Sequence, residues 1–260
     1  MKNLIFIFSI VYLISGCSKN TISIPKKDFI NHFNVKSCLK SKDCFKNAFL
    51  STAFGADHEK TTMSSKIRKF KTNQLGIVYL TDDESKKSII EPFLSKYLEL
   101  MLTYTSIQMH SDLENPDIVV VFVKDYNTMF EDDYVTFYLK KYLGSDFDLN
   151  LFKNHYNNLC YGFTLIDKNG YIQTNINFIS YDLPKRTLDR CIQEEITQGL
   201  GLQKDTILPY TLFTDFKGPK YLTKLDFELI NFLYRKEIKV GMTRADISLI
   251  FDKLIKVPVK

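Results

Sequence analysis

Residues Asp117-Ile118-Val119-Val120-Val121-Phe122-Val123 form an almost continuous apolar run, bounded by Pro116 and Lys124. A short run of this kind, rich in β-branched residues, predicts a strand that is buried on both faces of its sheet. A sheet with two buried faces needs helices on both sides. The run therefore predicts an α/β (α+β) fold in which helices flank a sheet.

The segments around this run alternate between strand and helix patterns. Strands are expected at residues 67–70, 76–80 and 107–110. Between the second and third of these strands, apolar residues spaced four apart predict a long helix over residues 89–101. Pro92 lies inside that pattern, so the helix either kinks there or begins just before it.

The remaining segments predict a hairpin and further helices. Residues 127–156 have a mainly helical pattern, and one short helix is expected between Cys38 and Phe54. Residues 159–166 and 171–179 predict a β-hairpin, because the Asn-Gly pair between them tolerates the positive φ of a tight turn. Three helices follow, opening near Pro184, Thr223 and Thr243, and the last two begin with capping-box spacings, Thr223-x-x-Asp226 and Thr243-x-x-Asp246.

The helix that opens near Pro184 carries the sequence CIQEEITQGLGL at residues 191–202. This sequence resembles the zinc-peptidase signature H-E-x-x-H-x-x-G, in which two His residues one helical turn apart bind zinc and the Glu acts as general base. Here Glu194 and Gln198 stand at the two His positions, and Glu195 stands at the general-base position. Gly201 keeps the glycine that turns the chain out of the helix.

Two groups of proteins share these features. The order of elements resembles that of metzincin-like zinc peptidases, which implies a twisted mixed sheet flanked by helices over residues 66–257. Residues 191–205 and 222–242 are similar to a bacterial family known as domain of unknown function 2927, which implies no established activity. The matching residues are Cys191, Glu194, Glu195, Gln198, Leu200, Gly201, Leu202, Asp205, Leu222, Thr223, Asp226, Leu233, Tyr234, Gly241, Met242 and Thr243, and the Ser-x-Phe-x-Asp run of the family reads Thr211, Phe213 and Asp215.

The residues at the signature positions argue against zinc. Glu194 and Gln198 lie four apart and face the same way, but a carboxylate and a neutral amide are a poor pair of zinc ligands. The third metzincin ligand would fall at Lys204, a cation. Glu194, Gln198, Asp205 and Asp215 are oxygen donors that calcium or magnesium would accept, although their spacing is not that of an EF-hand. We therefore predict no metal and no cofactor, and we do not expect zinc-peptidase activity.

Glu195 remains the candidate catalytic residue. Adjacent helix positions point about 100° apart, so Glu194 and Glu195 cannot face each other as the carboxyl pair of a glycosidase. Glu195 could form such a pair with Asp205 or Asp215. Two other interpretations stay open: Glu195 shares a ligand pocket with Glu194, Gln198, Asp205 and Asp215, or it is a buried carboxylate that braces the following loop.

The beginning of the chain is typical of an exported lipoprotein. Lys2 precedes a short apolar core at residues 4–14, and Ile14-Ser15-Gly16-Cys17 has the form of a lipobox. We expect residues 1–16 to be a signal peptide, Cys17 to carry palmitate and anchor the chain to a membrane, and residues 17–65 to be a tether with a small extension. In a Gram-negative host, Ser18 favours the outer membrane facing the periplasm.

The four other cysteines are Cys38, Cys44, Cys160 and Cys191. An even number in an exported chain suggests disulfides, and four cysteines allow three pairings. We favour Cys38–Cys44, because the loop is short, which leaves Cys160–Cys191; four free thiols are the alternative. The net charge of +5 is spread without a dense Lys/Arg block, so we expect no nucleic-acid partner.

These features predict a lipid-anchored envelope protein with a peptidase-like domain that acts in binding or assembly. Its expected partners are the membrane, through Cys17, and an envelope protein, peptide or glycan. The alternative is a peptidase or glycan-cleaving hydrolase that uses Glu195 as general base.

Overall fold

The computed structural model describes residues 33–54, 66–126, 131–145, 148, 160–203, 205–206, 208–214 and 219–254. Five strands form one sheet in the order β2-β1-β3-β5-β4. They are β1 (Gln74–Thr81), β2 (Gln108–Ser111), β3 (Ile118–Val123), β4 (Cys160–Ile166) and β5 (Ile172–Ser180). The β4–β5 pairing is antiparallel and the other three pairings are parallel. The edge strand β4 therefore runs against the rest of the sheet.

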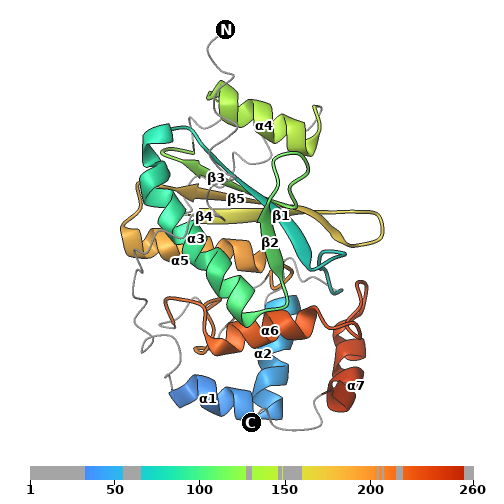
Figure 1. Cartoon of the computed structure of the whole chain (residues 1–260). Coiled ribbons are helices and arrows are strands. Elements are labelled where there is room, and N and C mark those ends of the chain that lie inside the picture. The colour runs from blue at the N-terminus through green and yellow to red at the C-terminus, as the bar shows by residue number, and fades with distance from the viewer. Residues whose placement is uncertain are drawn as a thin grey trace.

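The apolar run that predicted the fold is the central strand β3, and every residue of it is buried. Its odd and even positions belong to two separate hydrophobic cores, with Val120 in one and Val121 in the other. Helices α3 (Lys87–Tyr104) and α5 (Lys185–Gln198) pack in the first core, and α4 (Asp133–Leu143) packs in the second (Figure 1). Helices on both faces confirm the predicted mixed α/β fold.

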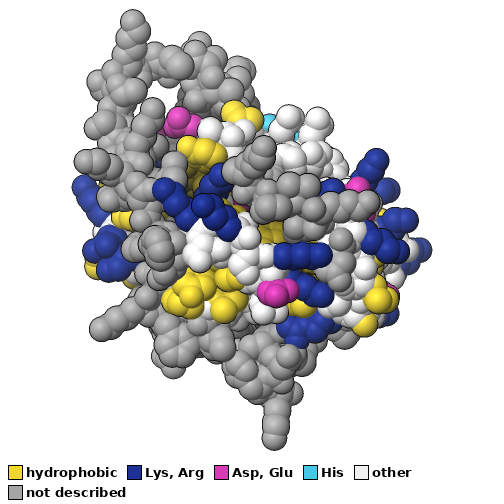
Figure 2. All heavy atoms as spheres, turned by 90° about the horizontal axis from the view of Figure 1, so that it is seen from below, with side chains coloured by type: hydrophobic (Ala, Val, Ile, Leu, Met, Phe, Trp, Pro, Cys, Tyr) yellow, Lys and Arg dark blue, Asp and Glu magenta, His cyan; other side chains and the backbone are white. Residues whose placement is uncertain are grey.

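The other helices extend the first core beyond the sheet. They are α1 (Phe33–Lys40), α2 (Lys42–Phe54), α6 (Lys224–Leu233) and α7 (Arg244–Leu254), which lie together at the lower end of Figure 1. Phe45 and Phe49 of α2 contact Phe232 of α6, with ring centroids 5.8 and 4.7 Å apart. Seen from this end, Lys and Arg side chains are more prominent than Asp and Glu (Figure 2).

The first helices differ from the single short one expected between Cys38 and Phe54. The chain forms two helices that meet at Ser41, whose N–H donates to the Ser37 and Cys38 carbonyl oxygens. The Ser41 hydroxyl then accepts from Cys44 N at 3.2 Å. The predicted disulfide Cys38–Cys44 joins α1 to α2 across this corner, with Cα atoms 5.0 Å apart.

Several sequence-based boundaries need correction. Residues 67–70 do not form a strand, because Phe70 alone makes a bridge, to Ile172. A short 3-10 helix, η3 (Glu84–Lys86), precedes α3, and Pro92 lies inside α3 after its first turn. The hairpin around Asn169-Gly170 is confirmed, and both capping-box spacings begin helices, α6 and α7. Much of the expected helix over residues 127–156 lies outside the described residues.

No helix among the described residues is long and apolar enough to cross a membrane. The expected signal peptide, the expected Cys17 anchor and the first part of the expected tether fall in residues 1–32, outside the described residues.

Candidate functional site

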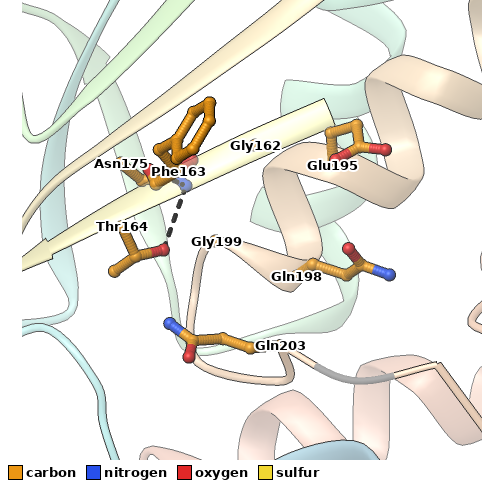
Figure 3. A pocket seen from close by; sticks show the side chains of 8 residues that line it. All are labelled: Gly162, Phe163, Thr164, Asn175, Glu195, Gln198, Gly199 and Gln203. Atoms are coloured by element: carbon orange, nitrogen blue, oxygen red, sulfur yellow. Dashed lines mark hydrogen bonds between the residues drawn. The ribbon is translucent and has the colours of Figure 1, made fainter. Parts of the chain in front are cut away.

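A cavity of about 250 Å³ lies between the C-terminal half of α5 and the edge strand β4 (Figure 3). Its walls come from three places: β4, its neighbour β5, and the end of α5 with the loop that follows. The lining residues are Gly162, Phe163, Thr164, Asn175, Glu195, Gln198, Gly199 and Gln203. The cavity is therefore lined by three residues of the sequence at 191–202, Glu195, Gln198 and Gly199, of which Glu195 and Gln198 stand at signature positions.

The position of α5 over β4 is fixed by a covalent link. The predicted disulfide Cys160–Cys191 joins the first residue of β4 to α5, with Cα atoms 5.9 Å apart. Cys191 lies one helical turn before Glu195, so the two residues share a face of the helix. The same face that is tied to the edge strand thus carries Glu195 to the cavity.

The signature helix ends as its sequence predicted. Gly201 has φ of 119°, a left-handed conformation that side chains rarely adopt, and a Cβ atom there would collide with the Arg68 carbonyl oxygen. The chain therefore turns sharply after α5. This turn places Gln203 beneath the end of the helix, on the cavity wall.

Glu195 is half-buried and lines the cavity, and its carboxyl group makes no hydrogen bond or ion pair with any described residue. Burial raises its pKa from an ordinary 4.5 to about 8, and the negative charges of Glu194 and Asp205 act in the same direction. Arg190 lowers this pKa, but with less effect than burial. The group is therefore largely protonated at neutral pH, and it can accept or donate a proton near that pH.

The positions that hold zinc ligands in the peptidase signature carry residues that are bound to other side chains. Glu194 forms an ion pair with Arg190, with Oε2 2.9 Å from Nε. Gln198 Nε2 donates to Asp205 Oδ1 at 2.9 Å. The described residues contain no group of three His, Cys, Asp or Glu placed to hold a metal ion.

Two asparagines of β5 form a polar floor below α5. Asn175 Nδ2 donates to the Phe163 carbonyl oxygen at 3.1 Å, and Asn177 Nδ2 donates to Asn175 Oδ1 at 2.6 Å. Asn177 Oδ1 is buried without a hydrogen-bond partner among the described residues. Gln203 Nε2, on the cavity wall, is likewise a buried donor without one.

The opposite side of α5 is held by a second polar network. Lys96 Nζ of α3 pairs with Asp189 Oδ2 at 2.7 Å, and Gln193 Nε2 donates to Asp189 Oδ1 at 2.7 Å. Gln193 Oε1 in turn accepts from Leu222 N at 3.0 Å, just before α6. This network joins α3, α5 and the start of α6, so the cavity face of α5 rests on a rigid support.

The structure brings together part of the predicted set of site residues. Glu195 and Gln198 share the cavity, whereas Glu194 and Asp205 are their hydrogen-bonded or charged neighbours and do not line it. Asp215 lies outside the described residues. In the loop at residues 205–221, none of the described residues (205–206, 208–214 and 219–221) lines the cavity.

Sequence reasoning missed the residues of the sheet that complete the cavity. They are Gly162, Phe163 and Thr164 on β4, Asn175 on β5, and Gln203 after the helix. Two signals were present: a glycine inside a strand often marks close approach of another group, and Asn175 and Asn177 alternate with apolar residues along β5. Neither signal names the partner, because the contact between β4 and α5 is distant in sequence.

Comparison with known proteins gives one family. The model of a protein family of unknown function, DUF2927, matches residues 42–253, most of the chain. The match extends well beyond residues 191–205 and 222–242. A comparison with curated proteins finds no match.

Proposed function

This chain belongs to the protein family of unknown function DUF2927, and we propose that its domain is a ligand-binding module of the cell envelope, with the Glu195 cavity as its binding site. The observation that carries the proposal is the Glu195 carboxyl group, which faces a cavity without a hydrogen-bond partner among the described residues. A half-buried group of this kind is only partly hydrated, which costs free energy. A ligand that pairs with it recovers that cost and so gains affinity.

We also propose that the scaffold of this module is metzincin-like. Two features support this: β5 leads directly into the signature helix α5, and helices pack on a mixed sheet. The ion pair Arg190–Glu194 and the hydrogen bond Gln198–Asp205 occupy the positions that would otherwise coordinate zinc. This replacement favours binding or assembly over zinc-dependent peptide cleavage.

The envelope location rests on the lipobox that ends at Cys17. We expect lipid on Cys17 to hold the domain at a membrane surface, and the outer membrane in a Gram-negative host. A Cys17→Ser variant should move from the membrane fraction to the soluble fraction of the cell, because it lacks the acylated residue. If the variant is processed and stays in the membrane fraction, anchoring through Cys17 is wrong.

The binding function is tested with a peptide and a glycan probe. Trialanine amide and the trisaccharide of N-acetylglucosamine are titrated into the isotope-labelled protein, and backbone amide shifts are followed by NMR. Binding at the cavity should move the signals of Gly162, Thr164 and Gly199, which line it. If neither probe moves these signals up to millimolar concentration, the cavity is not a binding site for peptide or glycan.

A hydrolase is the second candidate, and the raised pKa of Glu195 is the observation that favours it. A carboxyl group with a pKa of about 8 can act as a general acid or base near neutral pH. This candidate requires that a purified protein cleaves a peptide or glycan and that Glu195→Gln loses this cleavage. Elemental analysis of the same preparation separates the mechanisms, since stoichiometric zinc at α5 would contradict an inactive peptidase scaffold.

A further inference from the structure

The cavity offers unpaired hydrogen-bonding groups at both of its ends. At one end are the two oxygens of Glu195 and the Oε1 of Gln198, whose Nε2 already donates to Asp205. Figure 3 shows that Gln198 Oε1 points to the side on which Glu195 lies. At the other end is Gln203 Nε2, a buried donor without a partner among the described residues.

The other polar side chains of the described lining, Asn175 and Thr164, already make hydrogen bonds. Asn175 Nδ2 donates to the Phe163 carbonyl and, at 3.4 Å, to Thr164 Oγ1. Asn175 Oδ1 accepts from Asn177. The groups left for a ligand are therefore Gln198 Oε1, the donor Gln203 Nε2 and the Glu195 carboxyl group, whose two oxygens both accept once it has released its proton.

The charges around the cavity are unbalanced. Glu194 and Asp205 lie close enough to Glu195 for their negative charges to raise its pKa. None of the eight described residues that line the cavity is Lys or Arg. The nearby Arg190 is used by Glu194 and also reaches the Thr214 carbonyl oxygen at 3.5 Å. An anionic ligand would meet net negative charge, whereas a cation would relieve it.

We propose that the cavity binds the primary ammonium group of a ligand, with Glu195 as its counter-ion, Gln198 Oε1 as a second acceptor and Gln203 Nε2 as the donor to an adjacent carbonyl or hydroxyl oxygen. This inference rests on the proposed binding function and adds the chemical class of the ligand. An ammonium group has three donors and no acceptor, which fits a cluster of acceptors. Two sources share this chemistry: the amino terminus of a peptide, and an amino sugar whose nitrogen is not acetylated.

The size of the cavity fits one end of such a ligand. A volume of about 250 Å³ corresponds to roughly eight water molecules at about 30 Å³ each. One or two amino-acid residues, or one sugar ring, occupy a space of this order. The rest of a longer chain would extend out of the cavity.

The test compares pairs of probes that differ by one acetyl group. Trialanine amide is compared with its N-acetyl form, and glucosamine with N-acetylglucosamine, each titrated into the purified protein at pH 6.5, where both amines carry a charge. The free amine should bind about tenfold or more tightly than its acetylated partner, because acetylation removes the charge that Glu195 would pair with. The pair that shows this difference identifies the source.

Two variants and one titration connect the effect to Glu195. Glu195→Gln should bind free and acetylated probes alike, whereas Glu99→Gln, which removes an exposed carboxylate of α3 outside the cavity, should keep the preference. In carboxyl ¹³C NMR, saturating free amine should bring the pKa of Glu195 from about 8 to below about 7, since a neighbouring positive charge favours the carboxylate.

The outcomes separate this inference from the proposed function. If acetylated probes bind at the cavity as tightly as free amines, or if the free amines raise the pKa of Glu195, the ammonium class is wrong while the cavity remains a binding site. If no probe of either pair, and neither probe of the earlier titration, moves the signals of the cavity residues, the binding function and the ammonium inference both fail.

Discussion

Gly162 of β4 lies directly opposite Glu195 of α5: a Cβ atom on Gly162 would be 3.4 Å from Glu195 Oε2 and 2.9 Å from Asn177 Oδ1. The edge strand therefore approaches the helix at a residue without a side chain. Because the disulfide Cys160–Cys191 holds the two elements at a fixed separation, the missing side chain leaves room beside the Glu195 carboxyl group. The cavity exists at this point because glycine is there.

Gly162→Val should fill this room and reduce the binding of any cavity ligand by about tenfold or more, because the added methyl groups would contact Glu195 and displace Asn177. Global stability should change by about 1 kcal/mol or less, since valine is favoured in strands and offsets part of the crowding. Titration of the probe and chemical denaturation measure the two effects. Ile166→Val, an exposed position of the same strand outside the cavity, is the control. Unchanged affinity in Gly162→Val would place the ligand elsewhere.

Glu195 should make stability depend on pH. In the folded state its pKa of about 8 lies above the ordinary value of 4.5. Between these two pH values the folded state therefore keeps a proton that the unfolded state has released. Stability contributed by the protonated group is thus complete below about pH 4.5 and is lost as the pH rises to 8. Glu195→Gln cannot ionise and should be more stable than the wild type at pH 8, by on the order of 1–3 kcal/mol, but nearly equal to it at pH 5.

Urea denaturation at pH 5 and pH 8 measures this difference. Burial also raises the pKa of Asp226, to about 7. Below pH 7 this group should change the free energy of unfolding with pH to a similar extent in wild type and in Glu195→Gln, so the difference between the two proteins isolates Glu195. Glu99→Gln on the surface of α3 controls for the change in net charge. An equal difference between Glu195→Gln and wild type at both pH values would show that Glu195 is not titrating in this window.

The sequence predicted the mixed α/β class and several elements of the fold, but not the composition of the site. The buried run at β3, the Asn-Gly hairpin and the two Thr-x-x-Asp caps are local patterns, and each predicted the element that the structure shows. The structure also confirms the favoured disulfide pairing, which was one of three that the four cysteines allowed. The cavity depends instead on Gly162, Asn175 and Gln203 coming together, and no local pattern records contacts between distant segments.

The signature helix gives a second example of what sequence patterns leave undecided. Its sequence predicted a pocket shared by Glu195 and Gln198, and both residues line the cavity. It did not show that Arg190 would pair with Glu194, or that Asp205 would accept from Gln198. Those interactions decide which groups remain available to a ligand, and they depend on the turn after α5.

The disulfide Cys160–Cys191 should contribute more to stability than Cys38–Cys44. The two links are 31 and 6 residues apart, and in the loop-entropy account they constrain the unfolded chain by roughly 3–4 and 2 kcal/mol respectively. Replacing each pair with serine and measuring the denaturation midpoint under oxidising conditions tests this order. Loss of Cys160–Cys191 should also weaken binding at the cavity, whereas loss of Cys38–Cys44 should not. Equal effects of the two replacements on binding would contradict a local role of Cys160–Cys191 at the cavity.

The two Thr-x-x-Asp caps offer a matched comparison between a buried and an exposed carboxylate. Asp226 of α6 is fully buried and accepts from Thr223 N at 2.6 Å and Thr223 Oγ1 at 2.8 Å, and also from Leu212 N at 3.3 Å. Asp246 of α7 makes the same two bonds to Thr243 but is exposed.

Asp226→Asn should destabilise the fold by about 2–3 kcal/mol, because the new NH₂ group would face an N–H donor in a buried site. Asp246→Asn should cost much less, since water replaces what is lost. Thermal or urea denaturation of both variants measures the contrast, and equal losses would mean that Asp226 acts as an ordinary cap and not as a brace for the Leu212 loop beside the site.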